Sequence, residues 1–225
     1  MKDGLKWRWV GNSPPALTQA KVPHDNSAAL EKGVQKLLDL GVVKEVEPGA
    51  RVVISPHFYV PKKKGEDPRF IFNMKRLNLT IPLKKFKMAS PKDLRKFIPK
   101  GAWASITDLE SAYYSVPIHR SFTKFLAFEH QGSGRTFKFM GMPMGLNQAP
   151  FTFTKLLQVL QKWLRRQQVH LLIYIDDIIV WNRERTKCDE HTVLLRESLS
   201  SLGFLINAKK SSTASARVFS WLGLR

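Results

Sequence analysis

Three stretches of the chain repeat apolar residues at the spacing of one helical face. We predict a first helix between a cap at Asn26 or Ser27 and Gly41, because a helix C-terminus favours glycine. A second, longer helix begins near Pro150, which suits a first helical turn, and a third spans about 189–202. The apolar positions of the first two helices are Leu30, Val34, Leu37 and Leu38, and Phe153, Leu156, Leu157, Leu160 and Leu164.

Runs of β-branched and aromatic residues predict strands among these helices. Two of the runs flank a basic turn and form one hairpin, and two more flank a Gln-Gly-Ser-Gly turn and form a second hairpin. Another run ends at an acid, and two short runs lie near the end of the chain. The predicted strands are residues 55–61, 69–73, 103–109, 125–128, 137–139, 204–206 and 219–224.

Two adjacent carboxylates, Asp176 and Asp177, interrupt the apolar run of residues 171–181. One interpretation is a tight hairpin turn with both side chains in water, since aspartate is favoured in turns. The other is a platform for divalent metal, because an unpaired buried carboxylate costs several kcal/mol. The dipeptide alone does not favour either interpretation.

Charge changes the picture, because 37 Lys and Arg residues outnumber 18 Asp and Glu residues and give a net charge of +19. Such an excess attracts polyanions, so nucleic acid is the first partner to consider. We expect no membrane partner, since the longest apolar run is broken by the two acids and no signal pattern precedes it. With Cys188 as the single cysteine, we expect no intrachain disulfide, no cysteine-based zinc site, and a reducing compartment, either cytoplasm or nucleus.

Asp108 ends an apolar strand pattern, as Asp176 and Asp177 interrupt another, and a helix separates the two in sequence. In an α/β layer such strands are expected to be sheet neighbours, which brings three carboxylates together. The three repel each other unless a multivalent cation neutralises them, and hard oxygen ligands favour Mg²⁺ or Mn²⁺. Two such ions support an in-line displacement at phosphate. Metal-dependent phosphoryl transfer on nucleic acid follows, with nuclease and polymerase both open.

Five segments in order resemble the fingers and palm of a reverse transcriptase. Tyr174-Ile-Asp176-Asp177 resembles the Tyr-x-Asp-Asp box of that family, and residues 107–118 resemble its first aspartate motif. The sequence of residues 153–157 and 203–207 is most similar to that of DIRS-type retrotransposons, which carry a tyrosine recombinase. Gypsy-type LTR elements are the second most similar class. The other resembling segments are the fingertip hairpin at 60–69 with 75–78, the loop and helix at 142–150, and the last palm motifs at 203–210 and 219–223.

The resemblance implies a polymerase right-hand fold of class α/β (α+β), whose palm has an antiparallel sheet backed by helices. It implies an RNA-directed DNA polymerase, a nucleotidyltransferase that uses two Mg²⁺ ions, with Mn²⁺ as a substitute. The implied partners are an RNA template, a DNA primer and deoxynucleotides. The implied subdomains are an N-terminal arm at 1–25, fingers at 26–100 and 117–145, and palm at 101–116 and 146–225.

The resemblance also assigns catalytic and metal-binding roles. Asp108 and Asp176, with Asp177 beside them, would hold the metal ions, together with the backbone carbonyl of Leu109. Lys210, or its neighbour Lys209, would donate a proton to the departing pyrophosphate. The alternative for this pair is two solvated surface lysines.

Nucleotide and primer contacts follow from the same resemblance. Lys63 and Arg69 would hold the triphosphate, and Tyr113 would exclude a 2′-hydroxyl, although a lysine-rich turn is often only solvated and Tyr113 could be a core aromatic. Met144 stands where relatives have Gln or Phe, and its thioether cannot donate a hydrogen bond to a nucleotide. The remaining implied residues are Ala112 and Gly145 at the nucleotide, and Phe219, Trp221, Leu222 and Gly223 at the primer grip, where plain core is the alternative.

Two alternatives to a reverse transcriptase remain. A non-catalytic or domesticated nucleic-acid-binding fragment would bind RNA without incorporating nucleotides, and an RNA-dependent RNA polymerase would use ribonucleotides. No thumb or RNase H sequence accompanies the palm motifs up to Arg225, so we expect this fragment to polymerise weakly.

Overall fold

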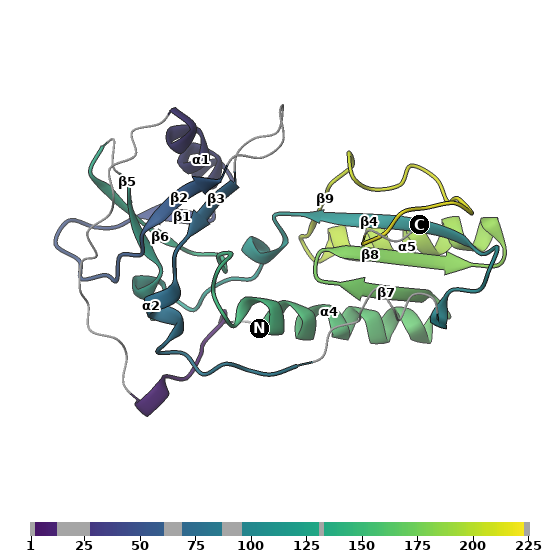
Figure 1. Ribbon diagram of the computed structural model, residues 1–225, viewed down its shortest axis with the longest axis horizontal. Helices are drawn as coiled ribbons and strands as arrows, with labels where there is room; N and C mark the ends of the chain where they lie inside the picture. The colour runs from purple at the N-terminus through teal and green to yellow at the C-terminus, as the bar shows by residue number, and fades with distance from the viewer. Residues whose placement is uncertain (1–2, 13–27, 61–68, 87–95, 131–132, 223–225) are drawn as a thin grey trace. The chain divides into compact units, whose positions relative to one another are not determined.

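The computed structural model describes residues 3–12, 28–60, 69–86, 96–130 and 133–222, and Figure 1 shows its secondary structure. The chain forms two compact units and crosses between them three times. Unit 1 comprises residues 1–84 and 113–149, and unit 2 comprises residues 85–112 and 150–225.

Unit 1 is built on a three-stranded sheet with the order β1-β6-β5 and on a separate hairpin, β2-β3, in its described residues. The sheet strands are β1 (Val43–Glu45), β5 (Ala127–His130) and β6 (Arg135–Phe139), and the hairpin strands are β2 (His57–Val60) and β3 (Arg69–Phe72). Both predicted hairpins are therefore confirmed as antiparallel pairs. The helical elements are η1 (Val10–Asn12), α1 (Ala28–Asp39), α2 (Lys75–Asn78) and η3 (Thr123–Phe125).

Phenylalanines from separate strands fill the core of unit 1. The ring centroids of Phe72 and Phe139 lie 4.5 Å apart in an edge-to-face arrangement, and those of Phe72 and Phe128 lie 5.0 Å apart. Edge-to-face packing matches the positive edge of one ring with the negative face of another. Trp7 joins this unit as well, because it is 7% exposed and packs edge-on against Phe122 at 4.5 Å.

Unit 2 contains, in its described residues, a four-stranded sheet with the order β7-β8-β4-β9. Figure 1 shows β7, β8 and β4 side by side with α5 behind them, and α5 contacts both β4 and β8. The strands are β4 (Trp103–Glu110), β7 (His170–Tyr174), β8 (Asp177–Asn182) and β9 (Leu205–Ile206). The helices are η2 (Ala112–Ser115), α4 (Ala149–Arg166) and α5 (Arg185–Ser201), with η2 and α4 crossing the unit boundary at one end.

The predicted helical faces agree with the buried positions. Val34 and Leu37 are buried in α1, and Phe153, Leu157, Leu160 and Leu164 are buried in α4. Gly41 follows α1 with a φ of +65°, the left-handed conformation that a helix C-terminus reserves for glycine.

Two predicted elements differ from the structure. The third helix, α5, begins at Arg185 and not near residue 189, because buried Cys188 extends its apolar face into a polar stretch. Residues 219–222 do not form a continuous strand. Their apolar side chains instead join a cluster on the sheet, in which Trp221 is 3% exposed and packs with Ala104 and Ile179.

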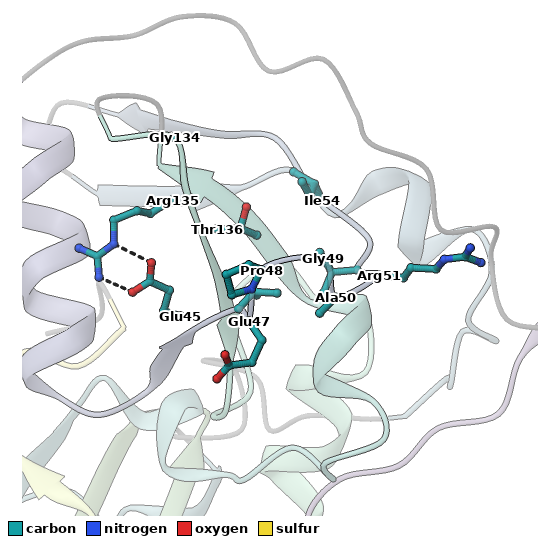
Figure 2. Close-up of a pocket in the computed structure, with 12 residues that line it drawn as sticks. Glu45, Glu47, Pro48, Gly49, Ala50, Arg51, Ile54, Gly134, Arg135 and Thr136 are labelled. Atoms are coloured by element: carbon teal, nitrogen blue, oxygen red, sulfur yellow. Dashed lines mark hydrogen bonds and ion pairs between the residues drawn. The ribbon is translucent and has the colours of Figure 1, made fainter.

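A broad hollow in unit 1 lies between the loop at residues 46–52 and the β5–β6 hairpin (Figure 2). Arg135 at its rim donates two hydrogen bonds to the carboxylate of Glu45, and this guanidinium lowers the pKa of Glu45. Its lining mixes acids with bases and includes none of the residues predicted to act on nucleotides or metal. Among the described helices, none has the length and hydropathy required to span a bilayer.

Candidate functional site

The acidic pair lies at the tip of the β7–β8 hairpin. Tyr174 pairs with Asp177, so Ile175 and Asp176 form a two-residue turn. Ile175 has a φ of +55°, which is rare for a β-branched residue and costs about 1–3 kcal/mol. Such strain gathers at functional sites, and here it sets the direction of the two carboxylates that follow.

Asp108 stands directly opposite Asp177 in the antiparallel β4–β8 pair. Side chains opposite each other in such a pair lie on the same face of the sheet, with Cβ atoms about 5 Å apart. The Asp176 carbonyl also accepts a hydrogen bond from the Leu109 N–H at 3.0 Å, which ties the turn to the end of β4. The prediction that the two acidic strands are sheet neighbours is therefore confirmed, and Asp177 pairs with Asp108 directly after the turn.

Burial and like charge act together on these acids. The pKa of Asp177 is raised to about 6, first by burial and then by the charges of Asp176 and Asp108. The pKa of Asp176 is also raised, mainly by burial, against a hydrogen bond from its own backbone N–H. The positive charge of Lys210 opposes the rise in pKa at both residues.

Lys210 reaches this position from a turn at residues 207–210. The Asn207 N–H donates to the Asp108 carbonyl at 2.9 Å, and the Lys210 N–H closes the turn onto the Asn207 carbonyl at 3.2 Å. The turn is thus fixed to the strand position that carries the first catalytic candidate. Lys209 lies in the same turn and is exposed.

The residues fit a hard divalent cation. Asp108 is only 8% exposed and faces a second carboxylate across the sheet, and burial of like charges calls for a positive ion. Oxygen ligands without cysteine or histidine suit Mg²⁺. Within the described residues, no three acidic, histidine or cysteine side chains are already arranged closely enough to hold a metal ion.

The predicted nucleotide-binding residues are distributed over several segments. Lys63 lies outside the described residues, and Arg69 begins β3. Ala112 is buried in η2, directly before the half-buried Tyr113. Met144 is 42% exposed.

The glycines of the loop at 141–145 approach backbone, as predicted, but the backbone is that of unit 1 itself. A Cβ added at Gly141 would overlap the carbonyl oxygen of Tyr114. A Cβ added at Gly145, whose φ is +99°, would lie 2.9 Å from the carbonyl oxygen of Phe72. Both glycines are therefore required by internal packing, whatever else the loop binds.

Sequence reasoning missed a pair of asparagines that fixes this loop. The Asn147 N–H donates to the side chain of Asn78 at 2.9 Å, and Asn78 Nδ2 donates to the Gly145 carbonyl at 2.7 Å. Asn147 Nδ2 donates in turn to the carbonyls of Asn78 and Ile81. The two residues lie 69 positions apart, so no local pattern signals their contact.

The described primer-grip candidates pack on the four-stranded sheet of unit 2. Trp221 is buried, and Phe219 and Leu222 are half-buried against the same apolar cluster, which also includes Tyr174. Gly223 lies outside the described residues. Packing in this cluster explains Trp221 without a nucleic-acid contact, whereas Phe219 and Leu222 keep exposed surface.

Comparison with known proteins gives consistent results. Residues 60–225 match the family described as reverse transcriptase (RNA-dependent DNA polymerase). The Gag-Pol polyprotein of Walleye dermal sarcoma virus is 27% identical over 201 residues, covering 88% of this chain and 11% of that protein. The Gag-Pol polyprotein of Woolly monkey sarcoma virus is 26% identical over 215 residues, covering 92% and 13%, and that of Feline leukemia virus is 24% identical over 206 residues, covering 88% and 12%.

The family match at residues 60–225 includes Asp108, Asp176 and Asp177. The chain spans about an eighth of the length of these viral relatives. Its mixed α/β content with antiparallel sheets agrees with a polymerase of fingers and palm. The chain belongs to the reverse transcriptase family, whose members are RNA-directed DNA polymerases and hence nucleotidyltransferases.

Proposed function

We propose that this chain is the fingers and palm of a retroelement reverse transcriptase that extends a DNA primer on an RNA or DNA template. The observation that supports this most directly is the pairing of Asp108 with Asp177 beside Asp176 at the hairpin tip. In this proposal unit 1 corresponds to the fingers and unit 2 to the palm, except that residues 85–100, which the resemblance assigns to the fingers, belong to unit 2. Assignment to a DIRS-type or gypsy-type element is a finer proposal, based on the sequence of residues 153–157 and 203–207.

Asp108 and Asp176, with Asp177 beside them, would hold two Mg²⁺ ions, and the backbone carbonyl of Leu109 would complete the set. When bound, the ions supply activation of the primer hydroxyl and stabilisation of the leaving phosphate. The chain itself contributes position, because the strained Ile175 turn and the β4–β8 pair fix the carboxylates before substrate arrives.

Other residues of the chain would bind substrate and move a proton. Lys63 and Arg69 would neutralise the triphosphate, and Met144 and Gly145 would border the nucleotide. Lys210 would donate a proton to the departing pyrophosphate, a role supported by its effect on the pKa of Asp176 and Asp177. Tyr113 and the adjoining Ala112 would lie under the sugar and exclude a 2′-hydroxyl.

A groove in unit 1 suits a single-stranded template. It is lined by Phe58, Ile71, Leu79 and Leu83, together with Asn78 and Gly145. Phe58, Leu79 and Leu83 are exposed, and an exposed aromatic ring such as that of Phe58 can stack on bases regardless of sequence. Lys75, which also lines the groove, is exposed and supplies positive charge for the backbone.

Primer extension on a homopolymer RNA template tests the function. We expect incorporation of deoxynucleotides with Mg²⁺ or Mn²⁺, strong preference over ribonucleotides, and loss of that preference in Tyr113→Ala. Asp176→Asn should abolish incorporation, whereas Glu197→Gln, an exposed change on α5, should leave it intact.

Incorporation that persists in Asp176→Asn would refute the assigned chemistry. Salt-sensitive RNA binding without incorporation, even with a thumb from a related enzyme fused to the chain, would favour a non-catalytic binding fragment. Preferential use of ribonucleotides by the unaltered chain would favour an RNA polymerase.

A further inference from the structure

The edge of β4 opposite β8 pairs with residues 206–216, and this segment is longer than regular antiparallel pairing requires. Leu109 pairs with Ile206, and Ala104 pairs with Ala216, both in antiparallel fashion. Between these two pairs β4 advances five positions, from 104 to 109, while its partner advances ten, from 206 to 216. The extra residues form a bulge that contains the turn at 207–210, and with it Lys209 and Lys210.

Two seryl side chains replace backbone carbonyls along this bulged edge. Ser211 Oγ accepts a hydrogen bond from the Asp108 N–H, and Ser212 Oγ accepts one from the Ile106 N–H, each at 3.0 Å. The Ser212 N–H donates in return to the Ile106 carbonyl at 2.8 Å. Consecutive serines therefore satisfy alternate amides of β4 and restore the register after the bulge.

Arg196 on α5 fixes both sides of this edge at once. Its Nε donates to Thr107 Oγ1 at 3.1 Å. Its Nη2 donates both to the Ile106 carbonyl at 3.2 Å and to the Ser212 carbonyl at 2.7 Å. Burial lowers the pKa of Arg196, so its hydrogen bonds form in a partly desolvated place. A guanidinium is suited to this task because its donors are planar and rigidly spaced.

We propose, on the basis of the polymerase function proposed above, that Arg196 is a positioning residue for the catalytic site. Arg196 joins β4 at Thr107 to the segment that follows the bulge. It thereby fixes the position of Asp108 relative to the turn that carries Lys210. Ser211 adds a second link, because its hydroxyl accepts a hydrogen bond from the Asp108 N–H. The side-chain hydrogen bonds of Arg196 go to Thr107, Ile106 and Ser212 and not to the proposed metal ligands.

The test uses two arginines on one helix. Arg196→Met removes the fork and keeps the apolar stem, while Arg185→Met serves as the matched control. Arg185 also lies on α5 and contacts β4, at the ring of Trp103 with 5.1 Å to the centroid, but at the end of the strand away from Asp108. Ser211→Ala and Ser211→Thr form a second pair, because threonine keeps the accepting hydroxyl.

We expect Arg196→Met to lower kcat for single-nucleotide incorporation about 10–100-fold, as loss of outer-shell partners commonly does, with KM for the deoxynucleotide within about twofold. Methylguanidinium added to the buffer should restore part of the rate in Arg196→Ala and none in Arg185→Ala. Ser211→Thr should retain activity that Ser211→Ala loses. Hydrogen exchange of the amides at 104–109 should quicken in Arg196→Met.

Unaltered kcat in Arg196→Met, or equal loss in Arg185→Met, would overturn the assignment and leave a general structural role. Unaltered amide exchange at 104–109 would overturn it as well, whatever the activity. If the unaltered chain incorporates no nucleotide at all, the proposed polymerase function fails, and the exchange measurement still decides whether Arg196 sets the strand edge.

Discussion

Asp177 occupies a strand position where a neutral side chain would suit the fold of unit 2 better than a carboxylate. It stands opposite Asp108 and next to Asp176, in a partly desolvated place. Like charges directly opposite each other in a sheet are destabilising, so the arrangement is retained at a cost in stability. The cost is expected at a site whose carboxylates must meet a cation.

Asp177→Asn should therefore stabilise the metal-free chain. Removing the repulsion with Asp108 is worth about 1 kcal/mol, which raises Tm by about 2–4 °C in a chain of this size. Differential scanning fluorimetry in EDTA measures the change. Mg²⁺ should raise the Tm of the unaltered chain more than that of the variant, and a Tm that falls in EDTA would contradict the repulsion.

Gly141→Ala should destabilise unit 1 by about 1–3 kcal/mol, since its Cβ overlaps the backbone carbonyl of Tyr114 and backbone cannot move aside cheaply. Gly49→Ala is the comparison, because a Cβ there meets no atom within 4 Å and only the φ of +80° opposes it. Urea denaturation of both variants gives the two free energies of unfolding. A smaller loss at Gly141 than at Gly49 would refute the overlap.

Cys188 should react slowly with thiol reagents in the folded chain. It is buried, and burial followed by the charge of Asp189 raises the pKa of its thiol, so less thiolate is present at any given pH than for an exposed cysteine. Labelling with Ellman's reagent at pH 8 should be fast only after unfolding in urea. Rapid labelling of the native chain would mean that the start of α5 opens readily.

Single residues were predictable where they ended a pattern. Asp108 and Asp177 each interrupt an apolar strand, and this interruption was enough to predict that they meet. Arg196 and Asn78 gave no such signal, because their partners Thr107 and Asn147 lie 89 and 69 positions away and the contacts depend on the completed fold.

Elements were predicted best where apolar periodicity was strong, as in α1 and α4. The start of α5 was missed because residues 185–187 are polar and its cap, Glu184, makes no side-chain capping hydrogen bond. Residues 219–222 were predicted as a strand from composition alone. Burial of Trp221 in an irregular segment shows that apolar, β-favouring residues can be selected for packing without pairing.

The loop at 145–148 and the segment at 78–82 should behave as one element, joined by Asn78 and Asn147. Asn147→Asp keeps the shape and removes the donor, leaving the carbonyls of Asn78 and Ile81 without it and adding a partly buried charge. We expect a loss of about 3 kcal/mol in the free energy of unfolding, measured in urea. Asn147→Ser, which retains a small donor, should lose less free energy of unfolding. An Asn147→Asp variant as stable as the unaltered chain would contradict the claim that these hydrogen bonds join the two segments.

At the scale of the whole molecule, the excess of positive charge predicts binding dominated by phosphate contacts. With a net charge of +19, affinity for primed template should fall linearly in log K against log salt, with a slope of several units. Fluorescence anisotropy from 50 to 200 mM KCl measures it. A flat salt dependence would show that the basic residues do not contact the nucleic acid.

The division into two units was only partly readable in the sequence. The resemblance to a reverse transcriptase predicted alternation of fingers and palm with boundaries near 100, 116 and 145, whereas the two units divide at 84, 112 and 149, so that residues 85–100, expected in the fingers, belong to unit 2. Hydrophobic pattern could not provide the crossings at 112 and 149, because η2 and α4 each continue through a boundary.

The place of β4 in its sheet has a consequence for how the protein folds during synthesis. Both of its neighbours, β8 and β9, come later in the chain, and the whole segment 113–149 of unit 1 is made in between. A growing chain therefore exposes β4 with two unpaired edges until residues beyond 182 have left the ribosome. Such late, non-local pairing slows folding and exposes an aggregation-prone strand, so yield on expression should depend on chaperones that protect this intermediate.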